Sequence, residues 1–190
     1  MKLGISSYSY TWAVGVPGHL PPVRMNENDL LQKAVEFGIK LVQIADNMPL
    51  HLMSEEQLER LTGNALNNGI ELEAGANRMT EENLGTYIDL AQKINSKILR
   101  FVIDGEGFRP SVSEIVSVIK NAEPELRRRD IILAVENHDR LFTYQFEEII
   151  AAVGSPWVAI CLDCANSLGV GEGIHEVVSR LAQYSVNFHL

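Results

Sequence analysis

Short apolar runs alternate with amphipathic segments along the whole chain. Seven runs rich in Ile, Val and Leu cover Leu3–Ser6, Leu41–Ala45, Ile70–Ala74, Ile98–Ile103, Ile131–Val135, Val158–Leu162 and Val186–Phe188. Short continuous apolar runs are typical of parallel strands that are buried on both faces. Successive runs begin about 30 residues apart, which is the length of a strand followed by a crossover helix. The pattern therefore predicts repeated strand–helix units.

The segments between these runs carry helix-capping residues and helical periodicity. Asn26, Ser54 and Thr80 each precede apolar residues at helical spacing, and Gly38 and Gly69 follow the first two segments. Asn, Ser and Thr cap helix N-termini because their side-chain oxygens accept backbone N–H groups, and Gly readily takes the left-handed conformation at a helix end. Further helices are expected from Ser111 or Ser113, from Thr143 to Val153 and from Ile174 to Leu181, and Pro124 should kink or end the first of these.

Strands that alternate with helices can form an open doubly wound sheet or a closed barrel. Gly4 stands alone in the first strand, so the G-x-G-x-x-G motif of a Rossmann fold is missing there. Gly169, Gly171 and Gly173 follow the sixth strand and form either a flexible loop or a phosphate-binding turn. Polar residues recur at the strand ends, as in a TIM (β/α)8 barrel, which normally has about 250 residues. We expect one truncated barrel domain, residues 1–190, with seven strands and the eighth unit missing.

Three consecutive predicted strands end in side chains that can bind a metal ion. Glu136, Asp163 and His189 stand at these ends, so they should converge at the mouth of the barrel. A buried carboxylate needs a cation, and Glu136 could meet either a metal ion or Arg100 of the neighbouring strand. A histidine near a strand end could likewise be a ligand or only a hydrogen-bonded side chain. Together the three side chains predict a site for Mn²⁺, Mg²⁺, Co²⁺ or Zn²⁺.

Charge and composition exclude several classes of partner. The chain has 16 Lys and Arg against 25 Asp and Glu, and this net charge of −9 disfavours nucleic acid, whose phosphates require clustered cations. No apolar stretch reaches the about 18 residues of a membrane span, and the N-terminus lacks the features of a signal peptide. Cys161 and Cys164 form a C-x-x-C within a strand-like run, where their side chains point to opposite faces. We expect reduced, structural cysteines in a cytoplasmic protein.

Three phrases in the second half of the chain resemble a known family. LAVENHDR, ICLDCANSLGVGEG and VNFHL are similar to the xylose isomerase-like superfamily of sugar and sugar-phosphate isomerases and epimerases. Relatives of that family include tagatose and psicose 3-epimerases, hydroxypyruvate isomerase, inosose dehydratase and endonuclease IV. The resemblance implies that Glu136, Asp163 and His189 are metal ligands. The family's fourth ligand, a second Glu, would belong to a strand that these residues do not include. Asn166 replaces a His of many relatives, which weakens a multi-zinc endonuclease interpretation.

The resemblance implies a metal-dependent sugar isomerase or epimerase with Glu136 as the catalytic base. A metal that chelates a carbonyl and a neighbouring hydroxyl acidifies the adjacent C–H, and a carboxylate can then remove the proton. Arg100, His138 and Asn166 could bind substrate hydroxyls or an enediolate, and Trp12 could stack on a sugar or simply pack. A dehydratase or other lyase and a non-catalytic sugar-binding relative remain alternatives. Because the first and seventh strands would present open edges, we also expect oligomerisation.

Overall fold

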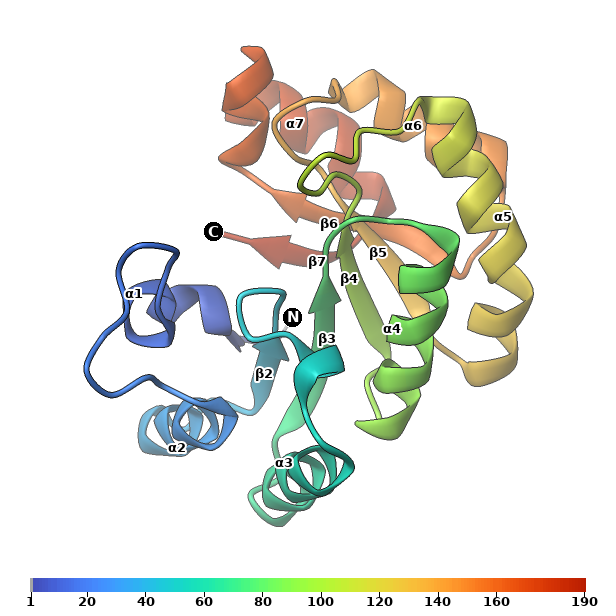
Figure 1. Ribbon diagram of the computed structural model, residues 1–190. Coiled ribbons are helices and arrows are strands. Elements are labelled where there is room, and N and C mark those ends of the chain that lie inside the picture. The colour runs from blue at the N-terminus through green and yellow to red at the C-terminus, as the bar shows by residue number, and fades with distance from the viewer. Residues whose placement is uncertain (1) are drawn as a thin grey trace. The chain divides into compact units, whose positions relative to one another are not determined.

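The computed structural model describes residues 2–190 (Figure 1). Strands and helices alternate along the chain, as the hydrophobic pattern predicts. The described residues fall into two compact units. One unit contains the chain up to Ala76 together with Asp89–Lys97, and the other contains Asn77–Ile88 and Ile98–Leu190. The helix α4 (Glu81–Lys93) is divided between the two units.

The first unit contains three parallel strands and three helices. Strand β1 (Ile5–Ser6) pairs with β2 (Leu41–Ile44), which pairs with β3 (Glu71–Ala76). The helices are α1 (Thr11–Val14), α2 (Glu27–Phe37) and α3 (Glu55–Asn67). Asn26 and Ser54 cap α2 and α3 as predicted, because each side chain accepts a backbone N–H of the first turn. Gly38 ends α2 in the left-handed conformation, with φ at 67°.

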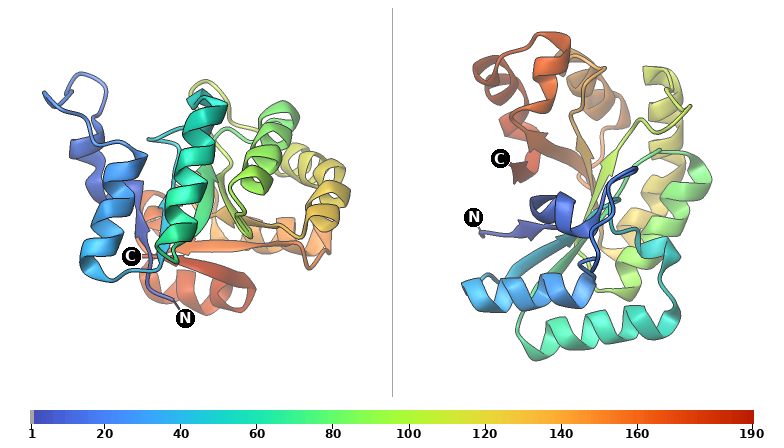
Figure 2. Two further views of the ribbon diagram at one scale, coloured as in Figure 1. Left: turned by 90° about the horizontal axis from the view of Figure 1, so that it is seen from below. Right: turned by 60° about the vertical axis from the view of Figure 1, so that its left-hand side comes forward.

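The second unit contains the remaining four strands, all parallel and in chain order. Strand β4 (Ile98–Val102) pairs with β5 (Ile132–Glu136), β5 with β6 (Val158–Asp163), and β6 with β7 (Ser185–His189). Helices α5 (Val112–Arg129), α6 (Thr143–Val153) and α7 (Ile174–Leu181) lie on one side of these strands (Figure 2). The predicted α/β organisation with seven strands is therefore present in the described residues.

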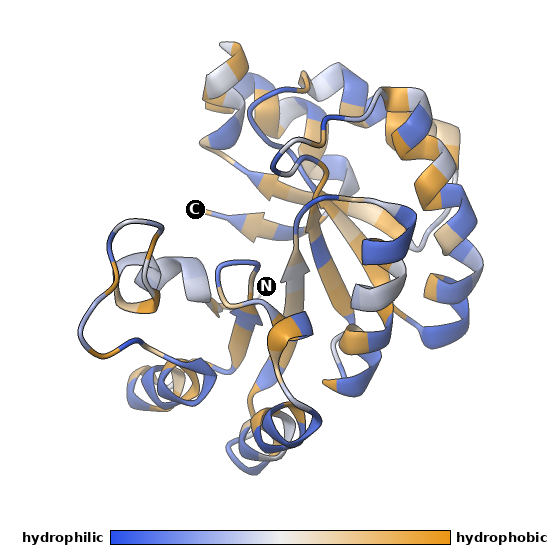
Figure 3. Cartoon of the chain, viewed as in Figure 1, coloured by the Kyte–Doolittle hydropathy of each residue, from blue (hydrophilic) through white to orange (hydrophobic). Residues whose placement is uncertain are grey.

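Side chains alternate between two environments along the strands of the second unit. Leu133 and Val135 are fully buried apolar residues, and the intervening positions of β5 carry Ala134 and Glu136. Each helix combines hydrophobic and hydrophilic residues, as the mixed colours in Figure 3 show, and buried apolar residues of the helices complete the core. Burial of a Leu or Val side chain contributes about 1.5–3 kcal/mol, and this core holds the strand ends in place. Glu136 therefore ends a rigid strand.

Two local expectations are modified by the structure. Pro124 neither ends the helix nor stands at its start, because α5 continues through it to Arg129. The first strand is shorter than the predicted Leu3–Ser6 and contains only Ile5 and Ser6. Cys161 and Cys164 are free cysteines, as predicted. No helix among residues 2–190 is long and apolar enough to cross a membrane.

Candidate active site

The carboxylate of Glu136 is the centre of a buried polar cluster at the end of β5. Glu136 is only 2% exposed, and Arg100 on β4 is 4% exposed. The guanidinium of Arg100 donates through Nε to Oε2 and through Nη2 to Oε1, the latter at 2.7 Å. The parallel register explains this contact, since Arg100 lies opposite Ala134, two residues before Glu136 on the same face of the sheet. The ion pair of Glu136 with Arg100, which the sequence leaves open as an alternative to a metal ion, is thus present.

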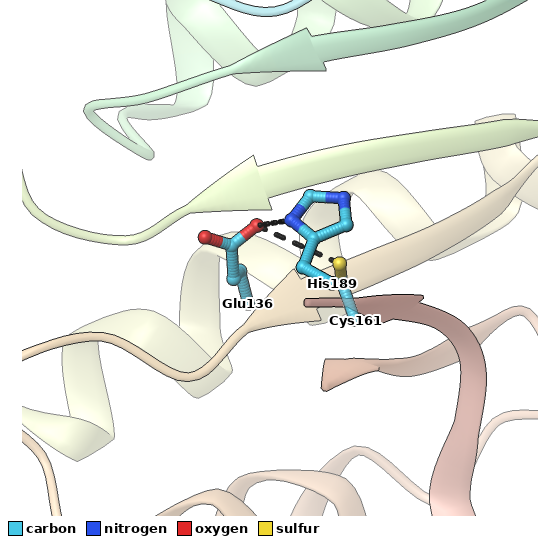
Figure 4. Close-up of side chains that lie close together, drawn as sticks. All are labelled: Glu136, Cys161 and His189. Carbon is cyan, nitrogen blue, oxygen red and sulfur yellow. Dashed lines mark hydrogen bonds and ion pairs between the residues drawn. The ribbon is translucent and has the colours of Figure 1, made fainter. Parts of the chain in front are cut away.

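His189 and Cys161 reach the same carboxylate from the two following strands (Figure 4). Nδ1 of His189 lies 3.1 Å from Oε2 of Glu136, and the thiol of Cys161 donates to that oxygen at 3.5 Å. Cys161 is the direct partner of Glu136 in the β5–β6 register. The sequence predicts a structural role for Cys161, but this residue lies two positions before Asp163 on the same face of the strand, and its thiol contacts Glu136.

The environment of Glu136 strongly favours its ionised form. Burial by itself raises the pKa of this carboxyl group, because a low-dielectric surrounding disfavours the charge. Hydrogen bonds from His189 and Arg100, together with the positive charge of the guanidinium, outweigh burial and lower the pKa to about 2. Glu136 is therefore an anion throughout the neutral range.

Asp163 lies beside this cluster and is held by the backbone. It is the β6 partner of His189 in the register. Its Oδ1 accepts the N–H groups of Ala165 and Asn166, both at 2.8 Å, which stabilises the turn after the strand. The Asp163 side chain is only partly buried.

Two asparagines connect the ends of β5 and β6. Asn137 is fully buried, accepts the N–H of Asp163 at 2.8 Å and donates to the carbonyl of Asp163 at 2.8 Å. Asn166 donates through Nδ2 to Oε1 of Glu136 at 3.1 Å. The structure thus places Asn166 in the cluster, and its predicted role in substrate binding stays a prediction. Asn137 was not predicted, because nothing in an isolated Asn between Glu and His signals a link between two strands.

Two other predicted substrate-binding residues, His138 and Trp12, have contacts with residues other than Glu136. The side chain of His138 is 40% exposed, and its Nδ1 lies 3.6 Å from Oδ2 of Asp139. Trp12 belongs to the first unit, is 71% exposed and meets the ring of His19 edge-on at 5.9 Å. An exposed Trp can stack on the apolar face of a sugar, so both residues remain proposals.

The donor atoms of the cluster fit a divalent metal ion in type and spacing. Ligand atoms of Glu136, Cys161 and His189 all lie within 4.8 Å of one another. Carboxylate and imidazole suit many divalent ions, and a thiolate favours Zn²⁺. Among residues 2–190 this is the group of ligand-type side chains close enough to share an ion, and Asp163 stands next to it across the β6–β7 register. The predicted set of Glu136, Asp163 and His189 remains a proposal.

Comparisons with known proteins agree with the fold. A family model described as "Xylose isomerase-like TIM barrel" matches residues 29–190. With the seven strands, this match confirms the predicted fold class, an α/β TIM barrel of which seven strands are present. The chain is 28% identical over 192 aligned residues to a 3-oxo-isoapionate decarboxylase of Pectobacterium atrosepticum, an alignment that covers 100% of the chain and 68% of that protein.

Solved structures share the fold at low sequence identity. A D-psicose 3-epimerase superposes with a TM-score of 0.78 at 16% identity, covering 100% of this chain and 72% of that one. A probable 3-DHS dehydratase from Bacillus anthracis superposes with a TM-score of 0.74 at 16% identity, covering 100% and 73%. These similarities establish the fold, and the three relatives named are an epimerase, a probable dehydratase and a decarboxylase.

Proposed function

Since this chain belongs to the xylose isomerase-like TIM-barrel family, we propose that it is an enzyme that decarboxylates a polyhydroxylated 3-oxo acid through an enediolate. The observation that carries the proposal is the Arg100–Glu136 ion pair at the strand ends, because it engages the carboxylate that the sequence predicts as the base and places a cation beside it. The similarity to a 3-oxo-isoapionate decarboxylase along the whole chain supports the same reaction class.

Decarboxylation of a 3-oxo acid needs an electron sink rather than a base. The C–C bond to the carboxylate breaks, its electron pair moves into the neighbouring carbonyl, and CO₂ leaves an enolate, or an enediolate where a hydroxyl adjoins. A general base works best when its pKa lies near the working pH, and Glu136 has a pKa of about 2. Hydrogen-bond donors that face a developing oxyanion stabilise the transition state directly. The cluster is therefore better suited to stabilise negative charge than to remove a proton.

The residues of the site take distinct roles in this proposal. Glu136 and His189, with Asp163 or Cys161, would hold a divalent ion, which when bound would polarise the substrate carbonyl as a Lewis acid. Arg100 and Asn166, whose N–H groups donate to Glu136, would supply donors to anionic oxygens of the substrate. The enediolate carbon then takes a proton that originates from solvent.

Residues nearer the surface bind the remainder of the substrate. We propose that His138 contacts its hydroxyl groups, because this side chain follows Glu136 by two residues and is 40% exposed. A polyhydroxylated substrate requires such contacts on several sides, since each hydroxyl loses a hydrogen bond to water when it enters the site.

Sugar isomerisation or epimerisation, with Glu136 as the base, is the second candidate. The 3.1 Å approach of His189 Nδ1 to Glu136 Oε2 favours it, because an imidazole next to a carboxylate can relay a proton. For this reaction Glu136 would have to release Arg100 before it could accept a proton from carbon. The two candidates share the enediolate and differ in how it forms.

A test of both candidates supplies the protein with Mn²⁺ and offers two sets of compounds in D₂O. One set contains polyhydroxylated 3-oxo acids and the other contains ketopentoses and ketohexoses. Decarboxylation predicts CO₂ release from the first set above the spontaneous rate, whereas epimerisation predicts deuterium at the carbon next to the carbonyl of the second set without CO₂. Glu136→Gln should abolish either activity. Glu147→Gln is the matched control, because Glu147 pairs with Arg180 away from the site.

No activity on either set would reject both candidates. Equal activity of the Glu136→Gln variant and the unmodified protein would remove Glu136 from the site.

A further inference from the structure

Three side chains from three consecutive strands bring an oxygen, a nitrogen and a sulfur together at the end of β5 (Figure 4). Oε2 of Glu136 lies 3.1 Å from Nδ1 of His189 and 3.5 Å from Sγ of Cys161. Among residues 2–190, the group whose ligand atoms all lie within 4.8 Å of one another contains these three side chains and not Asp163. Cys161 is therefore placed to be the third ligand of an ion that binds Glu136 and His189.

The two separations are close to those of a tetrahedral zinc site. Zinc binds sulfur at about 2.3 Å and imidazole nitrogen or carboxylate oxygen at about 2.0–2.2 Å. Tetrahedral angles then set sulfur and oxygen about 3.5–3.6 Å apart, and nitrogen and oxygen about 3.3–3.4 Å apart. The observed distances from Oε2 are 3.5 Å to the sulfur and 3.1 Å to the nitrogen. The side chains are thus already spaced as ligands of one ion.

An ion can enter this set without removing Arg100 from Glu136. In the structure, the Cys161 thiol donates to Oε2 and Nδ1 of His189 faces the same oxygen. When the metal–sulfur bond forms, the thiol proton leaves to solvent, and a neutral imidazole that binds through Nδ1 carries its proton on Nε2. Both groups then bind the ion instead of facing Oε2, so Glu136 can bind the ion and still accept from Arg100.

Charge balance also favours a thiolate at this position. Glu136 contributes one negative charge and already lies against the Arg100 guanidinium, and a neutral imidazole adds none. A divalent ion that is buried beside them needs more negative charge than this carboxylate provides. Cys161 is fully buried, and its thiolate would supply that charge in direct contact with the ion.

We propose that the Cys161 thiolate is a metal ligand of this site and makes it selective for Zn²⁺-type ions over Mn²⁺ and Mg²⁺. This inference rests on the proposed function, in which the cluster holds a divalent ion, and it adds the third ligand and the class of ion. Thiolate ligands select Zn²⁺, whereas Mn²⁺ and Mg²⁺ prefer oxygen. Mn²⁺ in excess would still occupy the site through Glu136 and His189.

Cobalt reports the metal–sulfur bond directly. A thiolate bound to Co²⁺ gives an intense near-ultraviolet charge-transfer absorption, which oxygen and nitrogen ligands do not give. The unmodified protein, titrated with CoCl₂, should develop this band until each chain holds one Co²⁺, and an equimolar amount of Zn²⁺ should remove it. Co²⁺ that binds without the band, or that does not bind, would overturn the proposal.

Two cysteine variants assign the band to its residue. The chain has two cysteines, so Cys164→Ser leaves Cys161 as its thiol and should keep the band. Cys164 is the matched control, because its thiol donates to the carbonyl of His189 at 3.1 Å rather than to Glu136. Cys161→Ser should lose the band and bind Zn²⁺ more weakly by at least the about tenfold that loss of a residue supporting a ligand costs. Mn²⁺ affinity should change less. Absence of the band in Cys164→Ser would overturn the proposal even if Cys161→Ser does not fold.

Asp163→Asn separates the two candidate third ligands. The band should persist in this variant. A band that disappears in Asp163→Asn and remains in Cys161→Ser would contradict the assignment to Cys161.

The outcomes also distinguish this inference from the proposed reaction. A band that depends on Cys161, without CO₂ release from any 3-oxo acid, would support the ligand and reject the decarboxylase. CO₂ release by a protein whose Co²⁺ complex lacks the band would support the decarboxylase and overturn the ligand.

Discussion

Replacement of Arg100 by Met should destabilise the metal-free protein by about 3 kcal/mol. Removal of one partner of a buried ion pair typically costs about 3–5 kcal/mol, because the other charge stays buried without compensation. Glu136 is 2% exposed, but Asn166 at 3.1 Å and His189 at 3.1 Å still face it, which favours the lower end of the range. For a chain of this length, 3 kcal/mol corresponds to a decrease in melting temperature of about 6–12 °C.

Urea unfolding followed by far-UV circular dichroism, with EDTA present, measures this loss. The control is Arg140→Met, whose pair with Asp104 has side chains 29% and 23% exposed and should contribute only about 1 kcal/mol. The double variant Arg100→Met/Glu136→Gln should recover part of the loss, because a neutral amide needs no cation. If Arg100→Met were no less stable than Arg140→Met, the reasoning that Arg100 compensates a buried charge would be refuted.

Three further predictions concern the same unit. The pKa of Glu136 is about 2 in the folded protein against a usual 4.5, so the stability that its ionised form contributes is complete above pH 4.5 and is lost as the pH falls toward 2. In acid titrations with EDTA, the free energy of unfolding, taken relative to Glu136→Gln, should therefore fall by on the order of 3 kcal/mol across that window. Asn137→Leu leaves the N–H and carbonyl of Asp163 without their partner and should cost about 2–4 kcal/mol in urea unfolding. Glu172→Gln weakens the carboxylate that accepts Thr143 N–H and Oγ1 at the start of α6, and a thermal melt should show a loss of about 1 kcal/mol; unchanged stability in either substitution would contradict its assigned contact.

The strand ends could be predicted because apolar periodicity and capping chemistry are local. Alternation along β5 put Glu136 on the inward face from the sequence, and the capping boxes at Ser54 and Ser111 lie where the helices begin. Pro124 does not end α5, which continues to Arg129. A proline inside a helix costs about 3 kcal/mol, which the burial of Ile119 and Leu126 on either side can offset.

The arrangement of partners around Glu136 could not be derived from local pattern alone. From the sequence, either a metal ion or Arg100 could be the cation beside Glu136, because the identity of the partner depends on strand register and on side-chain rotamers. The β4–β5 register places Arg100 two residues below Glu136, within reach of a long side chain. Cys161 reaches the carboxylate for a similar reason, since the β5–β6 register sets it directly opposite Glu136. Both contacts depend on how neighbouring strands are aligned in the sheet, which the pattern within a single strand does not specify.

The most direct test of the central claim is a single NMR experiment on one polyhydroxylated 3-oxo acid in D₂O, with CO₂ measured in the same tube. We expect one CO₂ to be released per substrate and one deuterium from the solvent to be incorporated at the carbon that carried the carboxylate. The rate should depend on Mn²⁺, and the reaction should not occur in Glu136→Gln. Deuterium exchange without CO₂, or CO₂ release at the rate of the protein-free solution, would contradict it.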